Sequence, residues 1–165
     1  MTQFRDKPDR LIRPAAFPAD LDAVRTLFRE YAAWLDIDFC FQGFEAELAA
    51  LPGYYAPPRG ELLLAFESSS VDPIGCVALR PMADADLCEM KRLYVRESAR
   101  GTGLGRTLAH SIVDTARNKG YRAMRLDTLG KLIPAITLYR SMGFKEIPAY
   151  YDNPIPGVVY LELAL

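Results

Sequence analysis

Hydrophobic residues recur every three or four positions in two stretches near the start of the chain. They run from Leu21 to Leu35 and from Phe41 to Leu51, and this period predicts an amphipathic helix in each stretch. Asp20 is placed to cap the first helix, and Pro52-Gly53 ends the second. Apolar runs bounded by polar turns then predict an antiparallel meander of three strands, at Glu61–Phe66, Pro73–Leu79 and Leu87–Val95.

After Val95 the pattern alternates between helix and strand. The predicted elements are the helix Leu104–Lys119, the strand Tyr121–Thr128, the helix Leu132–Met142, and the strands Phe144–Ile147 and Val158–Leu163. Repeats, linkers and low-complexity stretches are absent from the sequence. The expected fold class is therefore α/β (α+β), a mixed sheet with helices against it, in a single domain over residues 1–165.

Charge and hydropathy narrow the class of partner. The 165 residues carry 20 basic and 21 acidic side chains, so there is no basic excess to favour nucleic acid or an anionic membrane. No segment approaches the roughly 20 apolar residues of a membrane span. Met1 to Pro14 lacks the apolar run of a signal sequence. The expected partner is a small molecule, with no nucleic acid and no membrane.

The cysteines and the histidine exclude other kinds of site. Cys40, Cys76 and Cys88 are odd in number and far apart, which disfavours a disulfide framework or a zinc knuckle and fits reduced thiols in the cytoplasm. His110 is the single histidine, so a zinc site built on several histidines is excluded. We therefore expect a cytoplasmic protein without a metal site.

A glycine-rich segment lies between the third strand of the meander and the next helix. Its glycines remove Cβ atoms that would hold a ligand away from the backbone, and the helix start offers N–H groups and partial positive charge to an anion. The pattern is neither G-x-G-x-x-G nor G-x-x-x-x-G-K-[ST], so it fits neither a dinucleotide fingerprint nor a P-loop. It indicates a phosphate-bearing ligand, and a plain turn that caps the helix is the alternative. The segment is Arg100, Gly101, Thr102, Gly103, Leu104, Gly105 and Arg106.

Two motifs together resemble the acyl-CoA-binding half of the GNAT N-acetyltransferase superfamily. The first is R-x-x-G-x-G at Arg100, Gly103 and Gly105, and the second is the run A-I-T-L-Y-R-S-M-G-F over Ala135–Phe144. The resemblance extends to nearly the whole chain in the order of its elements. It implies a GNAT-like acyl-CoA N-acyltransferase fold, with a mixed, mostly antiparallel sheet of about six to seven strands and helices on both faces. It also implies acetyl-CoA as cosubstrate.

The resemblance further implies roles for individual residues. The backbone of Leu93, Tyr94 and Val95 would pair with the pantetheine arm, and the N–H of Leu93 would point at the thioester carbonyl. The glycine-rich segment would wrap the pyrophosphate. Tyr139 matches the tyrosine that protonates the departing CoA thiolate, a role that suits a phenol. Leu132 stands where many members carry an asparagine that contacts CoA, which puts that one contact in doubt.

The reaction also needs a base, because an ammonium group must lose a proton before it attacks a thioester. Glu89 is the candidate, since it lies six residues before Val95, the spacing at which histone-acetyltransferase-type members place their general-base glutamate. Its pKa should be raised by burial, or it should act through ordered water. The alternatives are a surface glutamate paired with Lys91, and a mechanism that relies on water and backbone carbonyls.

In this fold the acceptor site is formed by the first two helices and the loop between the last two strands. Aromatic side chains and carboxylates there would suit a cationic amine, by cation–π contact and ion pairing, although Tyr31 fits the core at least as well. The candidates are Tyr31, Trp34, Tyr150, Tyr151 and Asn153.

The expected function is the acetyl-CoA-dependent transfer of an acetyl group directly to a primary amine. A non-catalytic acyl-CoA-binding sensor or interaction module is the first alternative, and a nucleotide-binding regulatory domain outside this family is the second. Pairing of sheet edges into a homodimer is common in folds of this kind. The sequence leaves open the identity of the amine and the length of the acyl chain.

Overall fold

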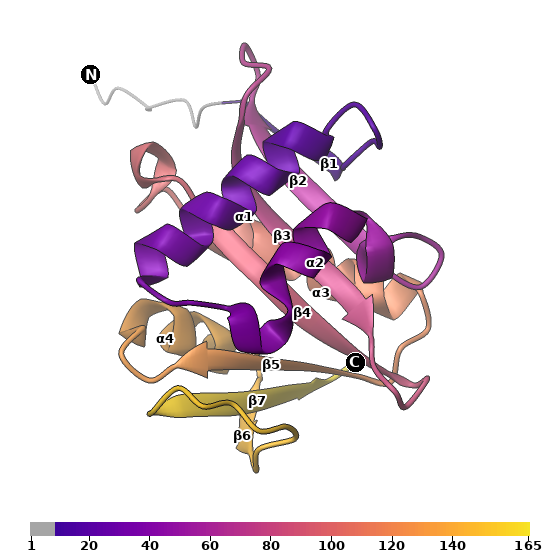
Figure 1. The fold of residues 1–165 in the computed structure, drawn as a ribbon, viewed down its shortest axis with the longest axis vertical. Coiled ribbons are helices and arrows are strands. Elements are labelled where there is room, and N and C mark those ends of the chain that lie inside the picture. Colours follow the sequence, from indigo (N-terminus) through magenta and orange to yellow (C-terminus); the bar gives the residue numbers. More distant parts are fainter. Residues whose placement is uncertain (1–8) are drawn as a thin grey trace, which may run out of the picture.

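One seven-stranded sheet forms the centre of the computed structural model, which describes residues 9–165 apart from the side chain of Phe41 (Figure 1). The strand order is β1-β2-β3-β4-β5-β7-β6, and β4 and β5 are the one parallel pair within these residues. The expected mixed, mostly antiparallel sheet is confirmed. Residues 1–8, on which the expectation about a signal sequence partly rests, lie outside the described residues. The strands are β1 Arg10–Pro14, β2 Glu61–Glu67, β3 Pro73–Pro81, β4 Leu87–Val95, β5 Ala123–Leu129, β6 Lys145–Ile147 and β7 Val158–Ala164.

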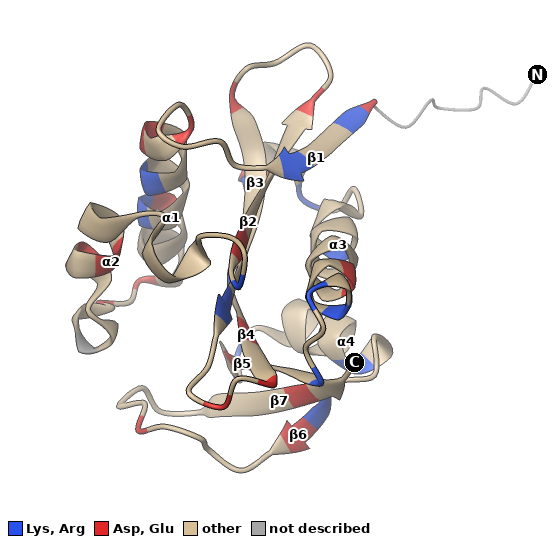
Figure 2. Ribbon diagram, turned by 90° about the vertical axis from the view of Figure 1, so that its right-hand side faces the viewer, with Lys and Arg blue, Asp and Glu red and all other residues tan. Residues whose placement is uncertain are grey.

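Helices cover both faces of the sheet, as expected (Figure 2). α1 and α2 lie on one face, and α3 and α4 lie on the other. Val24 and Phe28 of α1 are fully buried in one core, and Leu108 and Ile112 of α3 are fully buried in the other. Within residues 9–165, no helix has the length and apolar character needed to cross a membrane. The helices are α1 Leu21–Leu35, α2 Phe44–Ala50, α3 Leu104–Asn118 and α4 Ile133–Ser141, with short 3-10 turns η1 Cys40–Gln42, η2 Gly53–Tyr55 and η3 Glu97–Ala99.

The structure corrects two details of the predicted helices. Gly43, with a φ of 67°, separates η1 from α2 where one continuous helix was predicted; glycine enters this left-handed region without a steric cost. Asp20 does precede α1, but its side chain makes no capping hydrogen bond. Its Oδ2 instead accepts hydrogen bonds from the backbone N–H of Ala16 and from Nη1 of Arg13, both at 2.7 Å.

β4 and β5 are paired over only part of their length. The paired residues are Leu87 with Ala123, Cys88 with Met124, and Glu89 with Arg125. Beyond these pairs the two strands continue to Val95 and Leu129 without pairing to each other. A cavity occupies the resulting gap, lined by residues 90–93 of β4 and 126–129 of β5. The site described below is built around this gap.

The core beneath α3 gives a direct test of the fold. Leu108 has no exposed surface, so Leu108→Ala leaves a cavity between α3 and the sheet and should lower the free energy of unfolding by about 3 kcal/mol. Leu11→Ala is the matched control, because the Leu11 side chain is 53% exposed and its truncation removes little buried area. Urea denaturation of both variants checks the prediction, and equal losses in the two would contradict the packing described here.

Candidate functional site

A β-bulge in β4 sets the direction of the side chains at the gap. Between the pairs Cys76–Tyr94 and Ala78–Lys91, one residue of β3 stands opposite both Arg92 and Leu93. Arg92 has a φ of 59°, and its side chain lies on the same face of the sheet as that of Lys91. Leu93 packs toward the core beneath α3. The bulge therefore places two consecutive cations on the face covered by α1 and α2.

A groove of about 450 Å³ lies where the end of β4 meets the glycine-rich segment. Gly101 and Gly103 have φ values of 72° and 84°, and α3 begins directly after Gly103. The N-terminus of α3 therefore lies at the groove with its partial positive charge. Arg100 adds a full charge: its Nε donates to the carbonyl oxygen of Val95 at 2.9 Å, and its guanidinium lies 4.5 Å from the centre of the Trp34 ring. Such a groove suits a phosphate-bearing ligand.

The cavity in the gap between β4 and β5 has a volume of about 110 Å³. Leu93 and Trp34 line both this cavity and the groove. The two spaces therefore meet beside the bulge, so that a ligand in the groove and a second molecule in the cavity would approach each other near the backbone of Leu93.

Tyr139 of α4 lines the same cavity. Its side chain is 6% exposed and meets the ring of Phe144 edge-on, with 5.6 Å between the ring centres. Burial raises the pKa of Tyr139 well above its usual value. The phenol therefore keeps its proton at neutral pH and can donate a hydrogen bond into the cavity.

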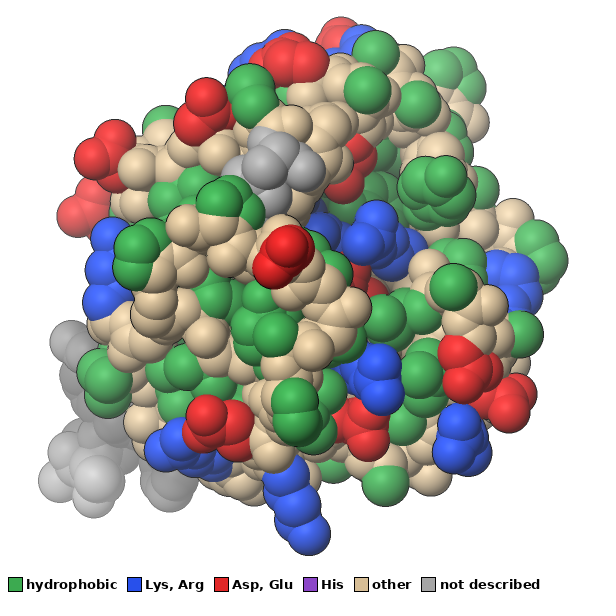
Figure 3. Space-filling view, turned by 60° about the horizontal axis from the view of Figure 1, so that its bottom comes forward, with side chains coloured by type: hydrophobic (Ala, Val, Ile, Leu, Met, Phe, Trp, Pro, Cys, Tyr) green, Lys and Arg blue, Asp and Glu red, His purple; other side chains and the backbone are tan. Residues whose placement is uncertain are grey.

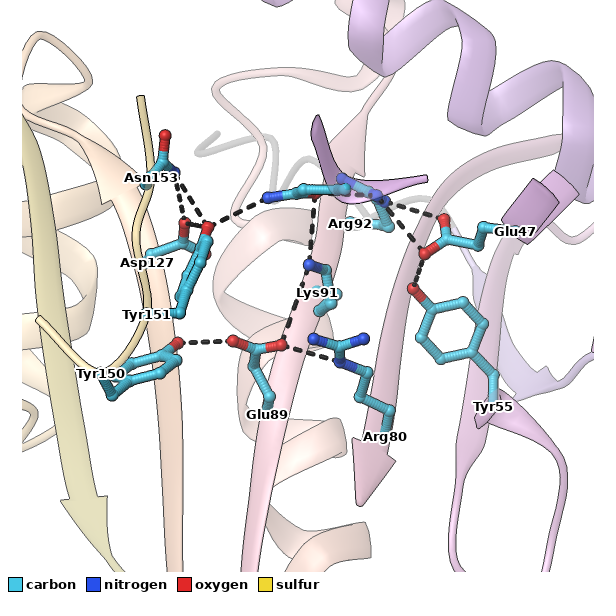
Figure 4. A network of polar contacts seen from close by, with 11 residues as sticks. Glu47, Tyr55, Arg80, Glu89, Lys91, Arg92, Asp127, Tyr150, Tyr151 and Asn153 are labelled. Atoms are coloured by element: carbon cyan, nitrogen blue, oxygen red, sulfur yellow. Dashed lines mark hydrogen bonds and ion pairs between the residues drawn. The ribbon is translucent and has the colours of Figure 1, made fainter. Parts of the chain in front are cut away.

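Glu89 lies on the same face of β4 as Lys91, but it does not line the cavity between β4 and β5. The residue is 1% exposed, and its Oε1 accepts a hydrogen bond from Nε of Arg80 at 2.8 Å and lies 3.8 Å from Nζ of Lys91 (Figure 4). Its Oε2 accepts from the hydroxyl of Tyr150 at 2.5 Å. These residues line a neighbouring hollow of about 240 Å³, which shares Gln42 and Lys91 with the cavity. The alternative that Glu89 is a surface glutamate paired with Lys91 is therefore wrong about the surface position, because Glu89 is buried. The predicted contact with Lys91 is present.

Gln42 joins the two cations of the bulge. Its Oε1 accepts hydrogen bonds from Nζ of Lys91 at 3.3 Å and from Nη2 of Arg92 at 3.1 Å. Nε of Arg92 also donates to Oε2 of Glu47 at 3.2 Å, and its guanidinium lies 4.7 Å from the centre of the Phe39 ring. Burial lowers the pKa of Lys91. Both cations line the cavity.

Asp127 of β5 forms the opposite wall and is held by the loop before β7. Its Oδ2 accepts from the hydroxyl of Tyr151 and, at 3.0 Å, from Nδ2 of Asn153. The Tyr151 hydroxyl also accepts from Nε2 of Gln42 at 3.1 Å, which links this loop to the far side of the gap. The space-filling view of this end of the molecule shows basic side chains in a hollow bordered by hydrophobic ones (Figure 3).

The structure brings most of the predicted site residues to these three spaces. Thr102 and Arg106 do not line the groove: Oγ1 of Thr102 accepts from Arg10 at 2.9 Å, and Nη1 of Arg106 donates to Ser141 at 3.3 Å. The groove is lined by Leu93, Tyr94, Val95, Arg100, Gly101, Gly103, Leu104 and Gly105. The cavity is lined by Tyr31, Trp34, Leu93, Tyr139 and Asn153, and the neighbouring hollow by Glu89, Tyr150 and Tyr151.

Sequence reasoning missed Gln42, Arg92 and Asp127. A signal existed for one of them. Glu89, Met90 and Lys91 alternate between charged and apolar, and the further charge at Arg92 breaks this two-residue alternation of a strand and indicates a bulge. Arg125, Leu126 and Asp127 alternate in the same way without a break, so Asp127 carries no such signal. Gln42 lies in a turn between two helices, where a polar residue carries no such signal.

Comparison with known proteins supports the fold and shows the family. Residues 23–144 match the acetyltransferase (GNAT) family. The chain is similar to an uncharacterised N-acetyltransferase of Schizosaccharomyces pombe, with 42% identity over 96% of this chain and 98% of the relative. It is also similar to one of Dictyostelium discoideum, with 31% identity over 88% of this chain and 94% of the relative. A solved acetyltransferase of the GNAT family from Staphylococcus aureus shares the fold, with a TM-score of 0.77, 17% identity, and coverage of 94% of this chain and 99% of that one.

The ion pair between Arg92 and Glu47 should stabilise the fold measurably. The two side chains are 3% and 18% exposed, so Arg92→Met leaves a mostly buried carboxylate without its partner and should cost about 3 kcal/mol of unfolding free energy. The double variant Arg92→Met/Glu47→Gln should recover part of that loss, because it removes the unpaired charge.

Arg29→Met is the control for this prediction. Arg29 and Glu45 form an ion pair whose side chains are 54% and 74% exposed, and exposed pairs contribute little. Urea denaturation gives the free energy of unfolding of each of the three variants and so checks their predicted order of stability. A single Arg92→Met variant as stable as Arg29→Met would show that the buried pair does not stabilise the fold.

Proposed function

We propose that this chain, which belongs to the acetyltransferase (GNAT) family, binds acetyl-CoA along β4 and transfers its acetyl group directly to a primary amine. The amine would bind in the cavity between β4 and β5. The observation that carries the proposal is the position of Leu93, which lines both the groove and the cavity. Donor and acceptor would meet there, and the family membership supplies the class of reaction.

The groove supports acetyl-CoA as the donor. The N-terminus of α3, Arg100 and the glycines before the helix offer positive charge and close backbone approach to a pyrophosphate. In the structure the carbonyl oxygen of Val95 accepts a hydrogen bond from Nε of Arg100. When acetyl-CoA binds, an amide N–H of the pantetheine arm would donate to this oxygen in place of Arg100, and the Arg100 guanidinium would then be free to contact phosphate.

The chemistry at Leu93 would be a direct transfer. The lone pair of the amine nitrogen attacks the thioester carbon, and the backbone N–H of Leu93 donates a hydrogen bond to the oxyanion that forms. Removing one donor of this kind typically costs about 3 kcal/mol of barrier. The carbon–sulfur bond then breaks, and the CoA sulfur takes a proton from Tyr139, whose phenol lines the cavity in its protonated form.

Glu89 is our proposal for the base that takes the proton from the amine. Its carboxylate lies in the hollow next to the cavity, and the two spaces share Gln42 and Lys91. We therefore propose that Glu89 acts through bound water and not by direct contact with the amine.

Release of free CoA distinguishes the enzyme from the alternative of a sensor module. The protein, acetyl-CoA and a broad panel of primary amines are incubated together, and free thiol is measured. An enzyme releases CoA with at least one amine at a rate well above hydrolysis. A protein that binds acetyl-CoA but releases no thiol with any amine would be a binding module, and the proposed function would be wrong.

A negative charge at the start of α3 should weaken acetyl-CoA binding without weakening the fold. In Gly105→Glu the new carboxylate lies in the first helical turn, where the helix end favours it, but it would repel the pyrophosphate. We expect the Kd for acetyl-CoA to rise at least tenfold at low salt, by calorimetry. His110→Glu, at an exposed position of the same helix, should leave the Kd nearly unchanged. Equal effects of the two substitutions would place the pyrophosphate elsewhere.

The two acidic residues near the cavity should have separable effects on turnover. Glu89→Gln should lower kcat roughly 100-fold, because it removes the proposed base. Asp127→Asn should act mainly on the KM for the amine. Steady-state kinetics make the comparison, with the Kd for acetyl-CoA as the control for folding. An unchanged kcat in Glu89→Gln would refute Glu89 as the base, and a larger loss of kcat in Asp127→Asn than in Glu89→Gln would assign that role to Asp127.

A further inference from the structure

The cavity between β4 and β5 has walls of opposite charge. Lys91 and Arg92 line it from β4, and Asp127 lines it from β5. In Figure 4 Lys91 and Arg92 lie on one side of the gap, and Asp127 lies on the other side with Tyr151 and Asn153 of the loop before β7 beside it. A molecule bound between these walls therefore experiences positive charge on one side and negative charge on the other.

The β4 wall keeps a net positive charge after its ion pairs are counted. Arg92 pairs with Glu47, and both Arg80 and Lys91 contact Glu89. Arg80 of β3 and the two cations of this wall therefore share two carboxylates, and neither carboxylate lines the cavity. The remaining positive charge lies among groups that are mostly shielded from water, since Lys91 and Arg92 are 8% and 4% exposed. A buried excess charge of this kind favours an anionic partner.

The position of Gln42 marks where an anionic oxygen would bind. Its Oε1 accepts hydrogen bonds from both Nζ of Lys91 and Nη2 of Arg92, at 3.3 and 3.1 Å. The two cations therefore converge on one neutral oxygen at the edge of the cavity. A carboxylate oxygen at that point would form stronger, charge-assisted hydrogen bonds than the amide does.

The β5 wall is arranged to receive a cation. Both hydrogen bonds to the Asp127 carboxylate, from Tyr151 and Asn153, end on Oδ2. Its other oxygen, Oδ1, takes no side-chain hydrogen bond from residues 9–165. That oxygen can accept from an ammonium group, and Asp127 lines the same cavity as Leu93 and Tyr139, where the acetyl group would be transferred.

The volume of the cavity limits the size of its occupant. About 110 Å³ holds a handful of water-sized groups, which suits a compact molecule with its two charges a few ångströms apart.

We propose that the acceptor of this enzyme is a small amine that also carries a carboxylate, that is, an amino acid in its zwitterionic form. Lys91 and Arg92 bind the carboxylate, and Asp127 binds the ammonium group before it is deprotonated. This inference rests on the proposed function, because it names the class of substrate for the same site.

The test compares amino acids with derivatives that differ only in the carboxylate. Standard amino acids are offered as free acids, as methyl esters and as the corresponding amines without the carboxyl group, and CoA release gives kcat/KM for each. We expect at least one free acid to exceed both of its derivatives by tenfold or more. Basicity of the amine cannot produce this preference, because it rises from the ester through the free acid to the amine without the carboxyl group, whereas the expected preference is highest for the free acid.

A charge variant links the preference to the site. Lys91→Met should lower the ratio of kcat/KM for the free acid to that for its ester by roughly tenfold. A ratio between two substrates does not depend on how much of the protein is folded. Lys145→Met removes the same charge from an exposed position on β6 and should leave the ratio unchanged.

The outcomes separate this inference from the proposed function. Turnover of amines without a carboxylate that equals or exceeds that of every free acid would overturn the inference and leave the N-acetyltransferase proposal standing. A ratio that Lys91→Met does not alter would also overturn it, because the carboxylate would then bind elsewhere. Absence of CoA release with every amine, while acetyl-CoA still binds, would overturn the proposed function and this inference with it.

Discussion

β4 and β5 share three residue pairs and then separate, and this separation frees backbone groups that a continuous sheet would use internally. The N–H of Leu93 and the carbonyl oxygen of Val95 lie on the free stretch of β4, beside the glycine-rich start of α3. A ligand can therefore pair with β4 where a neighbouring strand would otherwise lie. The bulge at Arg92 has a second consequence, since it turns an extra charged side chain toward the face of the sheet that α1 and α2 cover.

Six charged side chains within or beside the gap bear on both stability and chemistry. Removing charges from water is costly, and here every cation has a carboxylate partner, while tyrosine and amide groups donate hydrogen bonds to Glu47, to Glu89 and to Oδ2 of Asp127. Such a network holds its members in fixed positions, which an acceptor site requires. The charges are those of Glu47, Arg80, Glu89, Lys91, Arg92 and Asp127.

The order of the helices and of strands β2 to β7 could be predicted from hydrophobic periodicity, and the groove from glycine spacing, because both are local signals. Tyr139 was predicted only through the resemblance of Ala135–Phe144 to the GNAT family. The cavity between β4 and β5 could not be predicted. Its polar residues come from η1, β4, β5 and the loop before β7, and their meeting depends on a bulge and on long-range pairing. Gln42 and Asn153 are separated by more than half of the chain, so no local pattern joins them. Glu89 shows a further limit. Its position on a strand could be predicted from the sequence, but its burial against Arg80 and Tyr150 could not.

The most direct test of this account is a crystal structure of the protein with CoA bound. The account predicts that the pyrophosphate contacts the segment Arg100–Arg106, that the pantetheine arm pairs with β4 in place of the Arg100 side chain, and that the sulfur lies between the N–H of Leu93 and the hydroxyl of Tyr139. CoA bound away from the gap between β4 and β5, or with its sulfur distant from Leu93, would contradict it.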